Sequence, residues 1–198
     1  MASSWDFPTS LNVGGKEYDI RTDFRAVLDL LTALNDEELT DKNPHIEAYM
    51  KGRVILEIMF PKCDDIPEEY IQEAIDKVAE FIDMGIADGS RNYKTMDWEQ
   101  DAPILIPAIN KVLNKEVRAE KYLHWWTFLG AYMEIGESLF TNVVSIRLKK
   151  AKGKKLEKHE QEFYRENRSL IDFETKKQRS NEEKNIIDDY FFGHKKNK

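Results

Sequence analysis

Residues 122–136 read YLHWWTFLGAYMEIG, and this stretch decides the fold. Apolar side chains occur on nearly every side of the helix that the segment predicts. A helix that is apolar all round belongs at the centre of a fold, and Gly136 is expected to end or bend it. Because adjacent helical positions point about 100° apart, Trp125 and Trp126 cannot both face one partner. One of the two rings is therefore expected to pack inward.

Helical patterns continue on both sides of this central segment. Apolar residues recur at helical spacing, and cap residues or helix breakers mark the ends. Asp97 with Gln100 resembles a capping box, and Pro103 and Pro107 indicate a helix that starts late, near Pro107, or begins kinked. The expected helices run from a Thr22 cap to Leu34, from Asn43–Pro44 to a stop at Pro61, from an Asp65–Glu68 capping box to a stop at Gly85, around Ile109–Leu113, from Glu137 to Lys150 and from Leu156 to about Leu170.

The N-terminal segment shows a different period. Two short alternating runs, 9–13 and 16–20, flank Gly14 and Gly15. A Gly-Gly pair between such runs predicts a two-residue β-hairpin turn, since both glycines can take positive φ. A phosphate-binding glycine loop is the alternative interpretation, but its further glycines and its Lys-Ser/Thr ending do not follow.

These patterns predict a mainly α protein. An N-terminal β-hairpin packs on a bundle of about six helices, followed by a flexible polar C-terminal tail. The expected divisions are a hairpin segment at 1–21, a helical domain at 22–171 and a mobile tail at 172–198, where the composition becomes polar and loses its period.

Charge is distributed unevenly along the 198 residues. Residues 147–198 hold 16 Lys and Arg against 10 Asp and Glu, a charge of +6, whereas the remainder carries −13 of the total of −7. An acidic body with a basic C-terminal part argues against a protein that coats nucleic acid over its whole surface. The start of the chain lacks a signal-peptide pattern, and no apolar run reaches membrane-spanning length. A soluble, intracellular protein without membrane contacts is expected.

Motifs for catalysis or metal binding do not emerge. Cys63 lies beside Asp64 and Asp65, which disfavour a thiolate. His159-Glu160 lacks the second histidine of a zinc motif, and Glu134 with Glu137 lacks the histidines of a di-metal carboxylate site. His124 is interpreted as a buried or boundary histidine in preference to a general base. We therefore expect no enzyme, no metal and no cofactor.

A basic run is the strongest candidate for a binding surface. Three interpretations stay open: a solvated helix end whose cations favour the helix C-terminus, a surface for a protein partner, and a nucleic-acid patch, which lacks any recognisable reading motif. Its seven cations are Arg147, Lys149, Lys150, Lys152, Lys154, Lys155 and Lys158.

Three stretches resemble a known family. They are residues 11–25, residues 123–130 (LHWWTFLG) with 134–137, and residues 144–156, which contain IRLKKAKGKK, with 162–167. Together they resemble a bacteriophage protein family found in long-tailed phages and prophages of Gram-positive bacteria, over about residues 7–170. The tail beyond Phe173 lies outside this resemblance.

The resemblance implies a tail assembly chaperone. Such a protein acts in the cytoplasm of the bacterial host, holds the tape measure protein in solution, helps to recruit tail tube (major tail) subunits, and is absent from the mature virion. A second chaperone protein or another copy of the chain is a possible further partner, and nucleic acid is not expected. The alternative is a structural tail or head–tail component that stays in the virion.

Partner-binding residues are proposed from the residue types alone. Aromatic side chains are good anchors for a partner helix, and lysines steer the encounter with an acidic subunit. The candidates are Trp125, Trp126, Tyr132, Lys149, Lys150, Lys152, Lys154 and Lys155.

Overall fold

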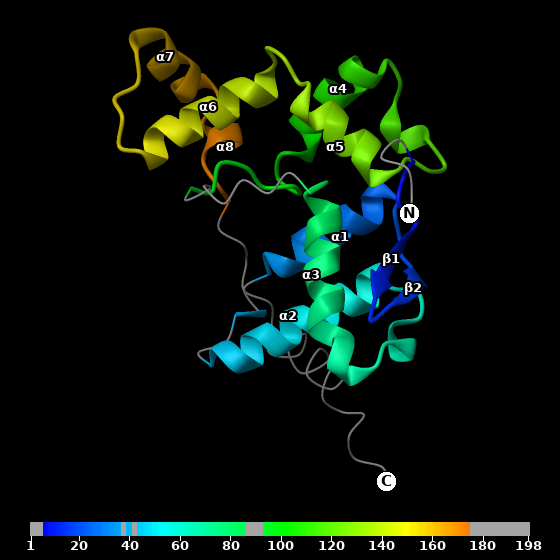
Figure 1. The fold of residues 1–198 in the computed structure, drawn as a ribbon. Coiled ribbons are helices and arrows are strands. Elements are labelled where there is room, and N and C mark those ends of the chain that lie inside the picture. The colour runs from blue at the N-terminus through cyan, green and yellow to red at the C-terminus, as the bar shows by residue number, and fades with distance from the viewer. Residues whose placement is uncertain (1–5, 37–38, 41–42, 86–92, 175–198) are drawn as a thin grey trace, which may run out of the picture.

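The computed structural model describes residues 6–36, 39–40, 43–85 and 93–174. Over these residues the chain is mainly helical, with one N-terminal hairpin, as predicted (Figure 1). The predicted tail from residue 175 onward lies outside the described part. The elements are β1 (Ser10–Val13), β2 (Lys16–Asp19), α1 (Phe24–Leu34), α2 (Pro44–Met59), α3 (Ile71–Ile82), α4 (Ala102–Leu113), α5 (Trp125–Met133), α6 (Leu139–Ala151), α7 (Lys158–Glu166) and α8 (Arg168–Ile171).

The predicted hairpin is confirmed. Strands β1 and β2 pair antiparallel, with Val13 opposite Lys16. Gly14 and Gly15 form the turn with φ of 57° and 79°, values that side chains disfavour. The tip rests on the start of α3, where Gly14 N–H donates to Glu73 at 3.2 Å. A Cβ at Gly14 would lie 2.7 Å from the Tyr70 ring, so this contact as well as φ requires glycine.

The start of α1 differs from the prediction by one residue. The cap is Asp23, whose carboxylate accepts the Arg25 N–H at 3.0 Å. Thr22 is engaged elsewhere, because its hydroxyl bonds to the Tyr122 hydroxyl at 2.7 Å and its carbonyl accepts the Trp125 N–H at 2.7 Å. The chain entering α1 therefore pairs with the chain entering α5, a long-range contact that the local pattern does not reveal.

Other helix boundaries also differ from the prediction. The predicted capping box at 65–68 does not form; short 3-10 turns occupy Cys63–Asp65 and Glu68–Tyr70, and α3 begins at Ile71 without a side-chain cap. Helix α4 begins early, at Ala102, and includes Pro107. Its Pro103 lies in the first turn, where a missing N–H costs little. The predicted last helix is divided at Asn167 into α7 and α8.

Helix α5 joins two groups of elements that Figure 1 shows one above the other. It contacts α1, which packs on α2 in the group with α3 and the hairpin, and it contacts α4 in the other group. Trp125, Phe128 and Ala131 of α5 are buried in the main core, to which the hairpin adds Val13 and Tyr18. A smaller cluster of Val143, Ile146 and Ile171 lies between α6 and α8. The central position predicted for α5 is therefore confirmed.

Candidate interaction surface

The Trp pair fastens α5 to the end of α3. The Trp125 indole N–H donates to the Ile82 carbonyl and that of Trp126 to the Phe81 carbonyl, both at 2.8 Å. Carbonyls in the last turn of a helix have no N–H partner farther along the same helix. The Trp125 indole supplies a donor to the Ile82 carbonyl, and the Trp126 indole adds a second donor to the Phe81 carbonyl, which also accepts the Met84 N–H at 3.2 Å. Trp125 is 1% exposed. The expectation that one ring packs inward is confirmed, and Trp125 presents no surface to a partner.

Two other aromatic or imidazole residues of this segment also have internal contacts. Tyr132, half-buried, packs its ring near Trp98 and Phe140 and donates its hydroxyl to the Met96 sulfur at 3.3 Å. His124 is 3% exposed and caps α5 by accepting the Trp126 N–H at its Nδ1. Its Nε2 lies 3.1 Å from the Pro8 carbonyl, which can only accept, so Nε2 carries the proton of a neutral ring. Burial lowers the pKa of His124, against the effect of the Pro8 hydrogen bond.

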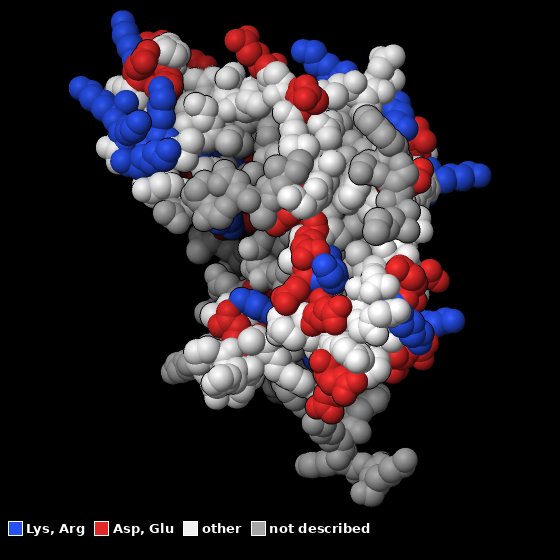
Figure 2. Space-filling model, in the orientation of Figure 1, with Lys and Arg blue, Asp and Glu red and all other residues white. Residues whose placement is uncertain are grey.

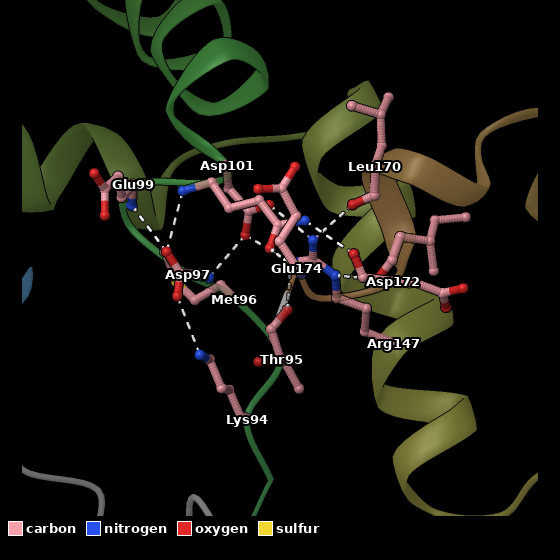
Figure 3. A network of polar contacts seen from close by, with 12 residues as sticks. Lys94, Thr95, Met96, Asp97, Glu99, Asp101, Arg147, Leu170, Asp172 and Glu174 are labelled. Atoms are coloured by element: carbon pink, nitrogen blue, oxygen red, sulfur yellow. Dashed lines mark hydrogen bonds and ion pairs between the residues drawn. The ribbon is translucent and has the colours of Figure 1, made fainter. Parts of the chain in front are cut away.

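A buried ion pair joins α4 to α6 (Figure 3). The Arg147 guanidinium meets the Asp101 carboxylate in a bidentate arrangement, at 2.6 and 2.9 Å, and the two side chains are 3% and 1% exposed. The same guanidinium donates to the carbonyls of Leu170 and Ile171 at 2.6 and 2.7 Å, and to that of Thr95 at 3.3 Å. Arg147 thus connects four segments and stays inside the protein.

The segment after α8 is bound to the same network. The Gln100 side-chain amide donates to the Asp172 carbonyl at 2.9 Å and accepts the Glu174 N–H at 3.1 Å. The predicted capping box is therefore only half correct: Asp97 accepts the Gln100 N–H, but the Gln100 side chain binds the C-terminal segment instead. Hydrogen bonds from Lys150, Arg168 and Tyr164 lower the pKa of Asp172 to about 2. Phe173 packs its ring under Arg147, 4.2 Å from the guanidinium carbon.

A partly apolar cleft lies on one side of α4. It has a cavity volume of about 470 Å³ and lies between α4 and the chain that links α5 to α6. We call it the α4–α6 cleft. Val112 in it is 38% exposed, and Met133 and Leu139, which flank the linker in the sequence, are 52% and 43% exposed. The lining residues are Ala108, Lys111, Val112, Glu134, Ile135, Gly136, Glu137 and Ser138.

The five lysines predicted to bind a partner divide into two sets. Lys149 pairs with Glu160, and Lys150 pairs with Asp172 while lying 4.0 Å from the centre of the Tyr164 ring. The other three cations are exposed around Gly153, which has a φ of 64°; this basic turn consists of Lys152, Lys154 and Lys155. Within the described residues Lys154 and Lys155 have no ion pair. Figure 2 shows the resulting concentration of positive charge over α6 and α7.

Sequence reasoning missed the role of Arg147. It counted this residue with the basic run, whereas the structure turns it inward. The signal was present: Arg147 follows Val143 by four positions, so it lies on the buried face of α6 with Ile146.

The described residues offer neither a metal-binding cluster nor a membrane-spanning helix. They contain no group of three or more His, Cys, Asp and Glu side chains placed to hold a metal ion. No helix among them has the length and apolar character needed to span a membrane.

The described fold and surface define a small helical protein with an internal polar network and two outward features, an apolar cleft and a basic turn. Residues 5–173 match the family described as Bacteriophage Gp15 protein. This match covers most of the chain, which therefore belongs to that bacteriophage family. The predicted bacteriophage affiliation is confirmed. No curated protein and no solved structure matches the chain.

Proposed function

We propose that this bacteriophage protein is a tail assembly chaperone of long-tailed phages of Gram-positive bacteria. It binds the tape measure protein in the host cytoplasm, helps to recruit tail tube subunits, and is absent from the finished virion. It performs no catalysis and needs no cofactor. The bacteriophage family supports a structural or morphogenetic role, and the α4–α6 cleft is the observation that carries the finer proposal.

The cleft fits the chemistry expected of such a partner. Its walls come from helices and a short linker, whose backbone gives no free strand edge for a β-strand to join. An amphipathic helix satisfies its own backbone and needs only an apolar surface. Ala108, Val112 and Ile135 supply that surface, and covering exposed apolar area is favourable by about 25 cal/mol per Å². A long helical tape measure protein offers such faces repeatedly.

The basic turn gives the protein a second point of contact. Three exposed lysines within four residues attract an acidic surface at long range and raise the association rate at low salt. We assign this surface to the recruitment of tail tube subunits. The cleft and the turn then serve different partners.

The first test is co-expression with the tape measure protein of the same phage. The wild-type chain should keep the tape measure protein in the soluble fraction and co-purify with it. Val112→Glu should abolish both effects. Ile46→Glu on α2 is the matched control, because Ile46 is exposed to a similar extent, 42% against 38% for Val112, and lies outside the cleft. An insoluble tape measure protein with the wild-type chain, or equal loss in both variants, contradicts the proposal.

Mass spectrometry of purified particles separates the proposal from its alternative. A chaperone should be missing from mature virions. Presence at a fixed ratio to the tube protein would instead make this chain a structural tail or head–tail component, a role that the family match also accommodates.

A further inference from the structure

Charge on the α4–α6 cleft is arranged unequally between its two walls. The wall formed by the linker between α5 and α6 carries Glu134 and Glu137, both exposed. The opposite wall, on α4, carries Lys111. Within the described chain neither glutamate has an ion pair or a side-chain hydrogen bond. The negative charges of Glu134 and Glu137 therefore lie beside the apolar residues of the cleft and are not neutralised by a described side chain.

We propose that the cleft binds an amphipathic helix whose apolar stripe is bordered by Lys or Arg along one side. This inference rests on the proposed function and names the chemistry of the partner segment. The apolar stripe covers Val112 and Ile135, while the basic border faces Glu134 and Glu137. A helix bordered by acidic residues on that side would place like charges together, so the two glutamates select against it.

The two glutamates should affect the choice between partner helices more than the overall affinity of the cleft for a helix. Exposed ion pairs contribute little individually and are screened by salt, whereas apolar contacts in the cleft are not. The charge of the bordering residues should therefore change affinity by about three- to tenfold at low ionic strength, and the difference should shrink in high salt. Apolar burial supplies the part of the affinity that salt does not remove.

The test uses two synthetic helical peptides with the same leucine stripe, one bordered by lysine and one by glutamate. Binding to the full-length protein is measured by fluorescence anisotropy at low and high salt. At low salt the lysine peptide should bind about three- to tenfold more tightly than the glutamate peptide. Glu134→Gln/Glu137→Gln should remove the preference, and Glu134→Lys/Glu137→Lys should reverse it. Asp19→Asn/Glu68→Gln, which removes the same charge from exposed residues outside the cleft, should leave it unchanged.

Two results overturn the inference. The first is equal binding of both peptides, or a preference that the control variant removes as well. The second is a concentration-dependent dimer that Glu134→Lys/Glu137→Lys dissociates, which would make a second copy of this chain the occupant. Co-expression with the tape measure protein does not depend on these variants. If it succeeds while the peptides show no preference, the charge inference fails alone and the chaperone proposal stands.

Discussion

Replacing Arg147 by methionine should destabilise the protein more than any surface change. The substitution removes the guanidinium that donates five hydrogen bonds and leaves the Asp101 carboxylate, 1% exposed, without its cation. Breaking a buried ion pair from one side costs about 3–5 kcal/mol. For a chain of this length that loss corresponds to a decrease in Tm of roughly 6–20 °C. The carbonyls of Leu170 and Ile171 lose their donor at the same time.

Urea denaturation followed by circular dichroism measures this loss as a free energy of unfolding. Arg118→Met is the matched control, because Arg118 pairs with Glu116 at the surface, with side chains 65% and 43% exposed. Its cost should stay within about 1 kcal/mol. Hydrogen exchange should also accelerate at residues 168–174 in Arg147→Met, since that segment loses the two hydrogen bonds that Arg147 donates to it and keeps, within the described residues, only the Lys150–Asp172 pair to α6.

A second variant identifies the cause of the loss. If the cost comes from an uncompensated buried charge, Arg147→Met/Asp101→Asn removes that charge and should regain at least about 1 kcal/mol relative to Arg147→Met alone. A loss no larger than that of Arg118→Met, or a double variant that shows the full sum of both single losses, would refute the reasoning.

Three further predictions concern the hairpin, His124 and the basic turn. Gly14→Ala and Gly15→Ala should each lower the free energy of unfolding by about 1–2 kcal/mol, because alanine disfavours the left-handed conformation of both residues. Gly14→Ala should be the more destabilising of the two in thermal unfolding, because its Cβ would meet the Tyr70 ring. Equal losses of stability would refute the Tyr70 contact. The pKa of His124 in the folded protein lies below its ordinary value of 6.5, so the unfolded state binds more protons. The contribution of His124 to stability is therefore complete above about pH 6.5 and decreases as the pH falls toward the folded pKa. His124→Asn replaces the cap with a residue that does not titrate and should flatten this pH dependence of the free energy of unfolding in urea titrations. Replacing all three lysines of the basic turn by glutamate should slow association with an acidic tube subunit and reduce its salt dependence, and an unchanged association rate at low salt would exclude that role.

Features with local causes could be predicted from the sequence. The hairpin follows from two glycines between alternating runs, and the start of α2 follows from Asn43, whose side chain accepts the His45 N–H at 3.0 Å, with Pro44 at the first helical position. The central place of α5 follows from its apolar character on all sides. In these cases the residues that determine the structure are neighbours in the chain.

Features with distant causes could not be predicted. Thr22 is a good cap by residue type, but its hydroxyl and carbonyl bind Tyr122 and Trp125, about a hundred positions away, and Asp23 caps α1 instead. The Trp pair was interpreted partly as an exposed anchor, because nothing local shows that both indoles reach carbonyls of α3. Local sequence patterns indicate whether a residue is apolar or can cap a helix, whereas these contacts depend on how the helices pack against one another.

The basic run shows how one stretch of sequence can serve two purposes. In α6 the helical period turns Arg147 to the buried side with Val143 and Ile146, while Lys149 and Lys150 pair at the edge of the α6–α8 region. After the helix ends, the three lysines of the basic turn are exposed, and Lys154 and Lys155 have no ion pair within the described residues. A guanidinium is suited to the inner position because it binds a carboxylate in a bidentate manner and still donates to carbonyls. Arg147 holds α6 against Asp101 and the end of α8, and the basic turn follows directly on α6. The position of the surface charge proposed to recruit a partner therefore depends on the buried ion pair.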